Sequence, residues 1–561
     1  MEYHDGERLS HLGDVPEMGA YRYGDRTAFR TSYGQEITYE GLEERSKKVA
    51  NALIAEGVEP GDRVGLFVPN TLQFPPAYFG AVKAGGVAVP INLRMDPDSM
   101  VYVVDNAEVD VMIASDKVPG GSAEDIAAEA DVSTVMLPGG SDDAPDGVDV
   151  VDYDGVVEEA SAELDRPERE FDDVAVQPYT SGTTGDPKGV LLTHENLLTT
   201  IESYSSGGLP IDPDDSILLI LPLFHIYGLN ALMGSFLYVG GSMVMQGVPN
   251  PTLMLNAIED EELTAFAGVP AMYNMMFREY EKNPDDYDVS SLDYAICAAA
   301  PLAEDTVEKI ETEWNVSVAE GWGMTETGPA GCVEPPRGVQ KEAGCVGAPV
   351  PNLEIKLVHP ENRDEVRVAP EDLEPAGMAK GTLDFDDEDS VTGEIAVRGP
   401  QIFEGYFKLP RKNDAVFDDE GWFYTEDIAR VDSDGYLWMV DRADDMIIAG
   451  GENIYPAEVE NGLYEHPDVA EAAVVAAPHE IKGEAPVAFV VLEEGVEEGV
   501  DITEEGLREF SLEHTARYAH PRRIFFVDEL PRSATQKVQR YKLEDKAEDR
   551  VDGALESSEE L

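Results

Sequence analysis

Short apolar runs alternate with amphipathic helical segments near the start of the chain, and this alternation constrains the fold more than any other feature. Residues 38–57 carry apolar side chains at helical spacing, which predicts a helix that ends at Gly57. Residues 78–83 belong to a second helical segment. Strands are expected at 64–68, 87–91 and 111–114. This order of elements predicts an α/β fold with parallel strand pairing.

The length of the chain indicates more than one domain. At 561 residues it is too long for a single compact core. Residues 136–173 and 359–392 are acidic and contain proline, so we expect both to be solvated excursions between elements.

The pattern changes beyond Asp441, where the predicted elements become shorter. Strands are expected near 469–476, 487–492 and 523–527, with a helix near 503–516. The predicted fold is therefore a large multi-subdomain N-terminal α/β domain followed by a small α+β C-terminal domain. The predicted limits are 1–441 for the first domain, 442–545 for the second and 546–561 for an acidic tail, with fraying after Leu543.

The charge of the chain excludes two classes of partner. It has 114 acidic and 40 basic residues, which gives a net charge of −74. Such a surface repels nucleic acid and anionic lipid headgroups, so neither is an expected partner. Self-repulsion of this size is tolerable where salt screens it, because the Debye length falls to about 3 Å in molar salt. We therefore infer a salt-loving source.

Three further features bear on location. The cysteines Cys297, Cys332 and Cys345 form no disulfide framework or zinc pattern, and the first residues do not read as a secretory signal, so a reducing cytoplasm is expected. Residues 216–244 carry no formal charge and are long enough to span a bilayer. Because a proline, a histidine and four glycines interrupt them, we expect buried core elements instead of a membrane span.

The strongest chemical motif covers residues 179–189, Tyr-Thr-Ser-Gly-Thr-Thr-Gly-Asp-Pro-Lys-Gly. Small hydroxyl residues and glycines allow backbone N–H groups to surround phosphate oxygens, and Lys188 adds a positive charge. A Walker loop would need Gly before the lysine and Ser or Thr after it, whereas Pro187 and Gly189 occupy those positions. A simple turn between two strands is the alternative interpretation.

This run resembles the signature of the adenylate-forming superfamily, which includes acyl-CoA synthetases, nonribosomal adenylation domains and luciferases. Four more family motifs follow in the family's order. The resemblance implies that the loop binds the phosphates of ATP, and that Thr184 also helps to hold Mg²⁺. The residues concerned are Thr180, Ser181, Gly182, Thr183, Thr184, Gly185 and Lys188.

The second motif, residues 320–327, lies along the nucleotide in that family. By resemblance Trp322, a position where Tyr is more usual, would stack on adenine between Gly321 and Gly323. Thr325 would bond the α-phosphate and Glu326 would hold Mg²⁺. A metal ion there would neutralise charge as pyrophosphate departs. A turn with a helix cap would also explain these residue types.

The third and fourth motifs supply residues for ribose and for a domain rotation. Asp427 matches the family's ribose-binding carboxylate, although Glu426 stands where Gly is customary. The resemblance also implies that Arg442 contacts ribose and that Asp444 is the hinge of a mobile C-terminal domain. Gly450 and Gly451 would line the pantetheine tunnel of coenzyme A.

The fifth motif and the acyl side complete the expected site. Lys537, with Gln536 in a position where Gly is usual, matches the catalytic lysine that reaches the carboxylate and the α-phosphate. His225 would border the acyl pocket, and Ala300 with Pro301 resembles a strand facing adenine and the pocket. A hydrogen-bonded core histidine and tightly packed small residues are the alternatives.

These motifs predict an ATP-dependent ligase that converts a carboxylic acid and coenzyme A into an acyl-CoA through an acyl-adenylate. We expect a medium- or long-chain fatty acid, with an aryl acid or a short branched acid as alternatives. Rival interpretations are an enzyme that loads a carrier protein, a non-catalytic nucleotide-binding relative and a membrane-bound acyl transporter. The sequence leaves the oligomeric state open, and a homodimer is compatible with it.

Overall fold

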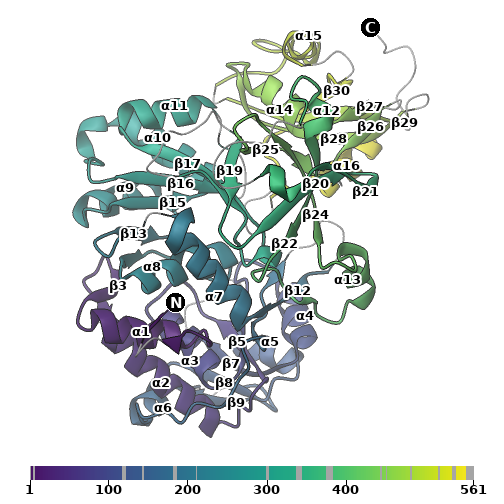
Figure 1. Cartoon of the computed structure of the whole chain (residues 1–561). Coiled ribbons are helices and arrows are strands. Elements are labelled where there is room, and N and C mark those ends of the chain that lie inside the picture. The colour runs from purple at the N-terminus through teal and green to yellow at the C-terminus, as the bar shows by residue number, and fades with distance from the viewer. Residues whose placement is uncertain are drawn as a thin grey trace.

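The computed structural model describes most of the chain (Figure 1). The described ranges are 2–3, 7–115, 122–141, 144–180, 186–209, 211–298, 302, 304–335, 344–373, 383–442, 445–449, 452–479, 483–493, 495–515, 519–532 and 538–550.

The first large sheet contains the predicted parallel strands. Its order is β11-β12-β10-β6-β5-β7-β8-β9, with β23 also pairing with β12, and the pairs from β10 to β9 are parallel. The bounds are β5 Arg63–Phe67, β6 Val87–Pro90, β7 Val109–Ala114, β8 Thr134–Leu137, β9 Asp149–Asp152, β10 Val174–Val176, β11 Tyr179–Thr180, β12 Lys188–Thr193 and β23 Gly405–Tyr406. The three expected strands are confirmed. Strand β9 lies within residues 136–173 and the last two residues of β8 also belong to them, so the prediction of a wholly solvated excursion there is wrong.

Helices pack against this sheet as the alternation predicted. Those in contact with it are α3 Phe74–Lys83, α4 Pro97–Ala107, α5 Ala123–Glu129 and α6 Tyr153–Glu159, and α2 Tyr39–Ala55 packs on α3 and α6. Helix α2 confirms the expected helix and begins after Thr38, whose Oγ1 accepts a hydrogen bond from the Gly41 N–H at 3.0 Å. Gly57 follows α2 with a φ of +97°, a conformation that glycine adopts without steric cost.

The second large sheet joins a parallel half to an antiparallel half. Its order is β21-β20-β22-β24-β25-β19-β18-β17-β16-β15-β13-β14-β3-β4. The bounds are β3 Thr27–Thr31, β4 Glu36–Thr38, β13 Ser216–Leu219, β14 Ser242–Met245, β15 Ala265–Gly268, β16 Tyr294–Ala298, β17 Ser317–Trp322, β18 Cys332–Val333, β19 Cys345–Pro349, β20 Glu354–His359, β21 Asn362–Val368, β22 Thr392–Arg398, β24 Phe423–Val431 and β25 Leu437–Arg442. Strand β21 occupies part of residues 359–392, which were expected to be solvated.

Further helices accompany the parallel half of this sheet. Their bounds are α7 His194–Ser203, α8 Ser235–Val239, α9 Pro251–Asp260, α10 Pro270–Lys282 and α11 Glu304–Glu313, with a π-helical turn η2 at Tyr227–Gly234. The uncharged residues 216–244 form β13, η2, α8 and most of β14, and they are mostly buried, which confirms the core interpretation. In the described ranges, no helix combines the length and apolar character needed to cross a bilayer.

A third, smaller sheet lies in the C-terminal part, at the top of Figure 1. Its order is β27-β26-β29-β28, with β30 also pairing with β29. The bounds are β26 Ile447–Ala449, β27 Glu452–Ile454, α14 Pro456–Tyr464, β28 Val469–His479, β29 Gly483–Leu492, α15 Glu504–His514, β30 Arg523–Phe526 and α16 Arg540–Arg550. The expected strands and helix are confirmed.

The distribution of buried apolar side chains supports two structural units. One cluster is shared by the two large sheets, whereas separate clusters lie on the two faces of the C-terminal sheet. Helix α16 continues to Arg550, and its Leu543 and Ala547 are buried against β28 and β29. The predicted fraying directly after Leu543 is therefore wrong, because these two side chains lie four residues apart on one helix face.

Candidate active site

Lys188, predicted to bind phosphate, lies at the end of a strand pair in the first sheet. Thr180 on β11 pairs with Lys188 on β12, so the hairpin places both at the ends of the loop. Lys188 is partly buried, and its Nζ lies 5.2 Å from the centre of the Tyr406 ring. Burial, and then the nearby Lys412, lower the pKa of Lys188, while Glu326 opposes this effect. An anionic ligand at this position would offset the burial and the repulsion that disfavour the charged form of Lys188.

A buried carboxylate lies in the same region. Glu326 belongs to the short 3₁₀ turn η4 (Thr325–Thr327), which follows β17, and it is 5% exposed. The Tyr406 hydroxyl donates a hydrogen bond to Glu326 Oε1 at 2.7 Å, and the Phe403 N–H donates to the Glu326 carbonyl at 2.9 Å. Burial raises the pKa of Glu326 above its ordinary value. The neighbouring Thr325 is also buried.

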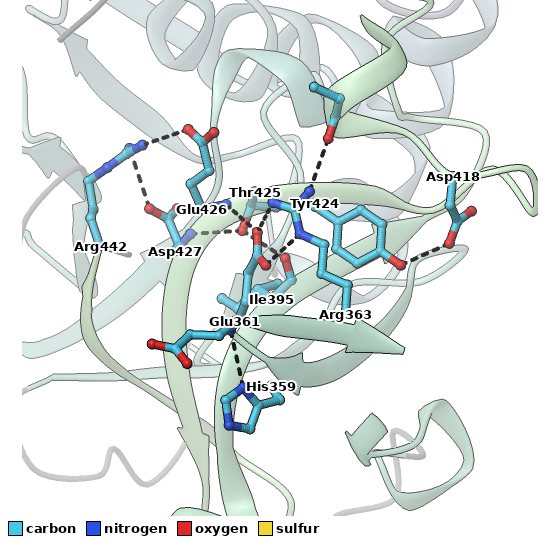
Figure 2. Close-up of polar contacts among 12 residues, drawn as sticks. His359, Glu361, Arg363, Ile395, Asp418, Tyr424, Thr425, Glu426, Asp427 and Arg442 are labelled. Atoms are coloured by element: carbon cyan, nitrogen blue, oxygen red, sulfur yellow. Dashed lines mark hydrogen bonds and ion pairs between the residues drawn. The ribbon is translucent and has the colours of Figure 1, made fainter. Parts of the chain in front are cut away.

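Asp427 is held between an indole and a guanidinium. The Trp322 Nε1–H donates to Asp427 Oδ2 at 2.8 Å, and Arg442 Nη1 lies 3.4 Å from Asp427 Oδ1. Asp427 and Arg442 are paired in register on β24 and β25, which explains why their side chains meet (Figure 2). The structure thus brings three of the predicted nucleotide-binding residues into direct contact.

The two glycines beside Trp322 differ in how strictly the fold requires them. A Cβ at Gly323 would lie 1.9 Å from the Pro329 carbonyl oxygen, which the backbone could not accommodate. A Cβ at Gly321 would meet the Cys332 carbonyl oxygen at 3.2 Å, a tighter contact than usual. Gly323 therefore allows the chain to fold back closely behind the Trp322 position.

Two residues of this group were missed at the level of sequence. Tyr406 on β23 reaches Glu326, and Lys412 on α13 (Pro410–Val416) reaches Glu426 with a distance of 3.0 Å between Nζ and Oε1. A lysine in so acidic a chain was a usable signal for Lys412. For Tyr406 no local pattern existed, because its partner is 80 residues away in sequence.

His225 is held by local backbone contacts at the beginning of η2. Its Nδ1 accepts from the Tyr227 N–H at 3.2 Å, and its carbonyl accepts from the Leu229 N–H at 3.0 Å. Its role at an acyl pocket stays a prediction. Several other predicted site residues lie outside the described residues, namely Ser181, Gly182, Thr183, Thr184, Gly185, Ala300, Pro301, Asp444, Gly450, Gly451 and Lys537.

The neighbourhood of the expected hinge is described on both sides. Asp441 at the end of β25 accepts from the Ala457 N–H at 2.9 Å, in the first turn of α14. Arg540 lies 3.4 Å from Asp445 and also bonds Glu460. Burial raises the pKa of Asp441 to about 7. The Asp441–Ala457 hydrogen bond joins the second sheet to the C-terminal unit, whereas the Arg540 contacts lie within that unit.

The donor set around Glu326 fits a magnesium ion bound mainly through a substrate. A buried carboxylate is a hard oxygen ligand of the kind Mg²⁺ prefers. Over the described ranges, no group of three or more acidic, histidine or cysteine side chains is arranged to hold a metal. Mg²⁺ commonly combines one or two carboxylates with substrate phosphates, which matches a site with Glu326 beside Lys188.

Comparison with family models identifies the chain. Residues 17–407 match the model of AMP-binding enzymes, and residues 458–537 match the model of the C-terminal domain of AMP-binding enzymes. The chain belongs to the AMP-binding enzyme family. It is therefore a member of the adenylate-forming superfamily, as the motifs predicted.

Relatives of this AMP-binding enzyme include two kinds of acid–CoA ligase. It is 33% identical to 4-coumarate–CoA ligase 2 of Nicotiana tabacum, over 90% of this chain and 88% of that protein. It is 31% identical to a long-chain-fatty-acid–CoA ligase of Bacillus subtilis, over 95% of this chain and 94% of that protein. The ATP-bound crystal structure of MatB from Rhodopseudomonas palustris superposes with a TM-score of 0.83, at 29% identity and over 97% and 100% of the two chains. The apo structure of MatB superposes with a TM-score of 0.73.

Proposed function

We propose that this AMP-binding enzyme is an AMP-forming acid–CoA ligase for a medium- or long-chain fatty acid. The observation that carries the proposal is the convergence of Lys188, Glu326 and the Trp322–Asp427–Arg442 group. A cation and a buried carboxylate suit a magnesium-bound triphosphate, and Asp427 suits the hydroxyls of ribose. The named acid–CoA ligases among the relatives support the same reaction class.

The reaction has two balanced steps. A carboxylate oxygen of the acid attacks the α-phosphorus of ATP, the bond to pyrophosphate breaks, and acyl-AMP forms. The thiol of coenzyme A then attacks the acyl carbon, loses its proton and displaces AMP. Lys188 and Lys537 would balance negative charge on the phosphates in the first step. Mg²⁺, held by Glu326 and Thr184, would neutralise charge as pyrophosphate leaves.

A rotation of the C-terminal domain would separate the two steps. The better superposition on ATP-bound than on apo MatB supports a domain arrangement suited to adenylation. We propose a boundary between residues 441 and 442, with the second domain extending through α16 to Arg550 because Ala547 packs against its sheet. Turning about Asp444 would withdraw Lys537 and bring Gly450 and Gly451 toward the pantetheine arm of coenzyme A.

The acyl substrate has two candidate classes. The apolar segment around His225 suits a fatty acid, and one group of relatives is named for long-chain fatty acids. An aryl acid with a polar substituent is favoured by Tyr227, whose hydroxyl is buried and has no hydrogen-bond partner among the described residues. A ligand oxygen near that hydroxyl would satisfy it. The 4-coumarate ligase relatives are consistent with this second candidate.

We propose a cytoplasmic location and a saline interior. The three cysteines are buried thiols that form no disulfide, which suits a reducing compartment. The net charge of −74 favours a medium in which salt screens repulsion. A homodimer is one arrangement that sedimentation in molar KCl would test.

The direct test is carboxylate-dependent AMP release from ATP in molar KCl. The assay compares reactions with and without coenzyme A across saturated fatty acids of increasing length and hydroxycinnamic acids. AMP formation that requires both coenzyme A and a fatty acid of medium or long chain supports the proposal. Activity only with aryl acids supports the second candidate. ATP binding without turnover of any acid would instead favour a carrier-protein acceptor or a non-catalytic nucleotide-binding protein.

A further inference from the structure

Glu426 has a backbone conformation that normally belongs to glycine. Its φ is +65°, between Thr425 and the ribose-binding candidate Asp427. Side chains other than glycine rarely adopt this left-handed region, because Cβ approaches the following carbonyl oxygen. Glutamate is therefore unfavourable for this backbone conformation, so its presence at position 426 suggests a function for the side chain.

The Glu426 carboxylate bridges two cations from different elements. Its Oε1 lies 3.0 Å from Lys412 Nζ on α13, and its Oε2 lies 3.7 Å from Arg442 Nη2 on β25. Figure 2 shows the Arg442 guanidinium between the neighbouring carboxylates of Glu426 and Asp427. One guanidinium is thus held by both acidic side chains in the middle of β24.

A buried carboxylate on the neighbouring strand β22 holds the backbone of Glu426. Its N–H donates to Glu394 Oε1 at 3.2 Å, and Glu394 is 1% exposed. Arg363 fixes that carboxylate with two hydrogen bonds, from Nε at 2.9 Å and from Nη2 at 2.8 Å. The Arg363–Glu394 pair therefore restricts the position from which the Glu426 side chain reaches the two cations.

Stability does not explain the glutamate. The side chains of Glu426, Lys412 and Arg442 are 35%, 34% and 36% exposed, so water and salt weaken their ion pairs. The left-handed backbone works in the opposite direction, because glycine would relieve its strain. The carboxylate instead fixes the positions of the cations. Lys412 lies close enough to Lys188 to lower the pKa of Lys188, and the two positive side chains would move apart without a nearby anion.

We propose that Glu426 is a positioning residue for nucleotide binding, which holds Arg442 beside Asp427 and Lys412 beside Lys188. The inference rests on the proposed function, since it assumes that ATP occupies this site. With Glu426 in place, both cations are ordered before the anionic ligand arrives, so less conformational freedom is lost on binding. Without the Glu426 carboxylate, Arg442 keeps its contact with Asp427 and loses its contact with residue 426, and Lys412 moves away from Lys188.

The test compares Glu426→Gly with wild type in two measurements, ATP binding by calorimetry without acid or coenzyme A, and thermal unfolding. The Kd for ATP should rise about three- to tenfold, as expected for two partly exposed charge contacts. The melting temperature should stay the same or rise, because strain is relieved. In the AMP-release assay with acid and coenzyme A present, the KM for ATP should rise, while kcat and the KM for coenzyme A change by less than about twofold.

Matched variants separate placement from general damage. Glu426→Gln keeps the shape and loses the charge, so its Kd for ATP should lie between wild type and Glu426→Gly. Lys412→Met should weaken ATP binding and add little to the effect of Glu426→Gly. Glu262 is an exposed residue with a φ of +48°, and Glu262→Gly should leave the Kd unchanged. Equal or tighter ATP binding by Glu426→Gly would overturn the inference, because the carboxylate would then only repel phosphates. Wild-type protein that binds no ATP would overturn the proposed function, and the inference with it.

Discussion

Glu320→Gln should stabilise the protein in alkali and leave its stability nearly unchanged in acid. Glu320 lies on β17 and is 4% exposed. The Gly344 N–H donates to its Oε1 at 3.3 Å, and its own N–H donates to Glu334 Oε2 at 3.2 Å. Burial, together with the charge of Glu334, raises the pKa of Glu320 from 4.5 to about 8.

The sign of the effect follows from proton linkage. The folded protein binds this proton more tightly than the unfolded chain does, so the contribution to stability is complete below about pH 4.5. It is lost as the pH rises through about 8. The interval between the two pKa values corresponds to at most ~5 kcal/mol, and relaxation of the surroundings should reduce the measured value to about 2–3 kcal/mol. Glutamine keeps an oxygen for the Gly344 N–H but cannot ionise, so it removes this loss.

Urea unfolding of the two proteins at pH 5, 7 and 9 in the same molar KCl measures the effect. The free energy of unfolding of Glu320→Gln minus that of wild type should grow from near zero at pH 5 to about 2–3 kcal/mol at pH 9. Glu158 is exposed, so Glu158→Gln is the control and should show no such trend. A difference that is equal at pH 5 and pH 9, or a variant that is less stable at pH 9, would refute the reasoning.

Three further predictions concern the site and the solvent. Tyr406→Phe removes the 2.7 Å hydrogen bond to Glu326, so the pKa of Glu326 should rise further. The apparent affinity for MgATP at pH 7 should then fall about tenfold. A titration with Mg²⁺ and ATP that matches wild type would contradict this. Lys537→Ala should greatly slow acyl-AMP formation yet largely spare thioester formation from supplied acyl-AMP, and equal loss of both steps in single-turnover assays would count against the two-state mechanism. Melting temperature and activity should be higher in molar KCl than in 0.1 M KCl, where the Debye length is about 10 Å; unfolding in molar KCl would be the opposite result.

Several candidate residues named from contiguous family motifs lie in contact in the structure, and their roles in the reaction stay predictions. Lys188, Glu326, Asp427 and Arg442 were named from sequence, and contacts join Trp322, Asp427 and Arg442 directly. Tyr406 was missed because its function depends on a partner that only folding brings near. The edge strand β9 (Asp-Val-Val-Asp) and the end of helix α16 were missed because acidic residues dominate both segments.

Periodicity in the sequence alone indicated the fold class, and the resemblance of its ordered motifs to the adenylate-forming superfamily indicated the reaction class, because both patterns can be read without coordinates. The tertiary structure decided which charges face one another. Strand pairing of β24 with β25 places Asp427 opposite Arg442, and the left-handed backbone at Glu426 directs a carboxylate between Arg442 and Lys412. Electrostatic interactions depend on distances across the fold, so residues far apart in sequence acquire their shared role only when the sheets assemble.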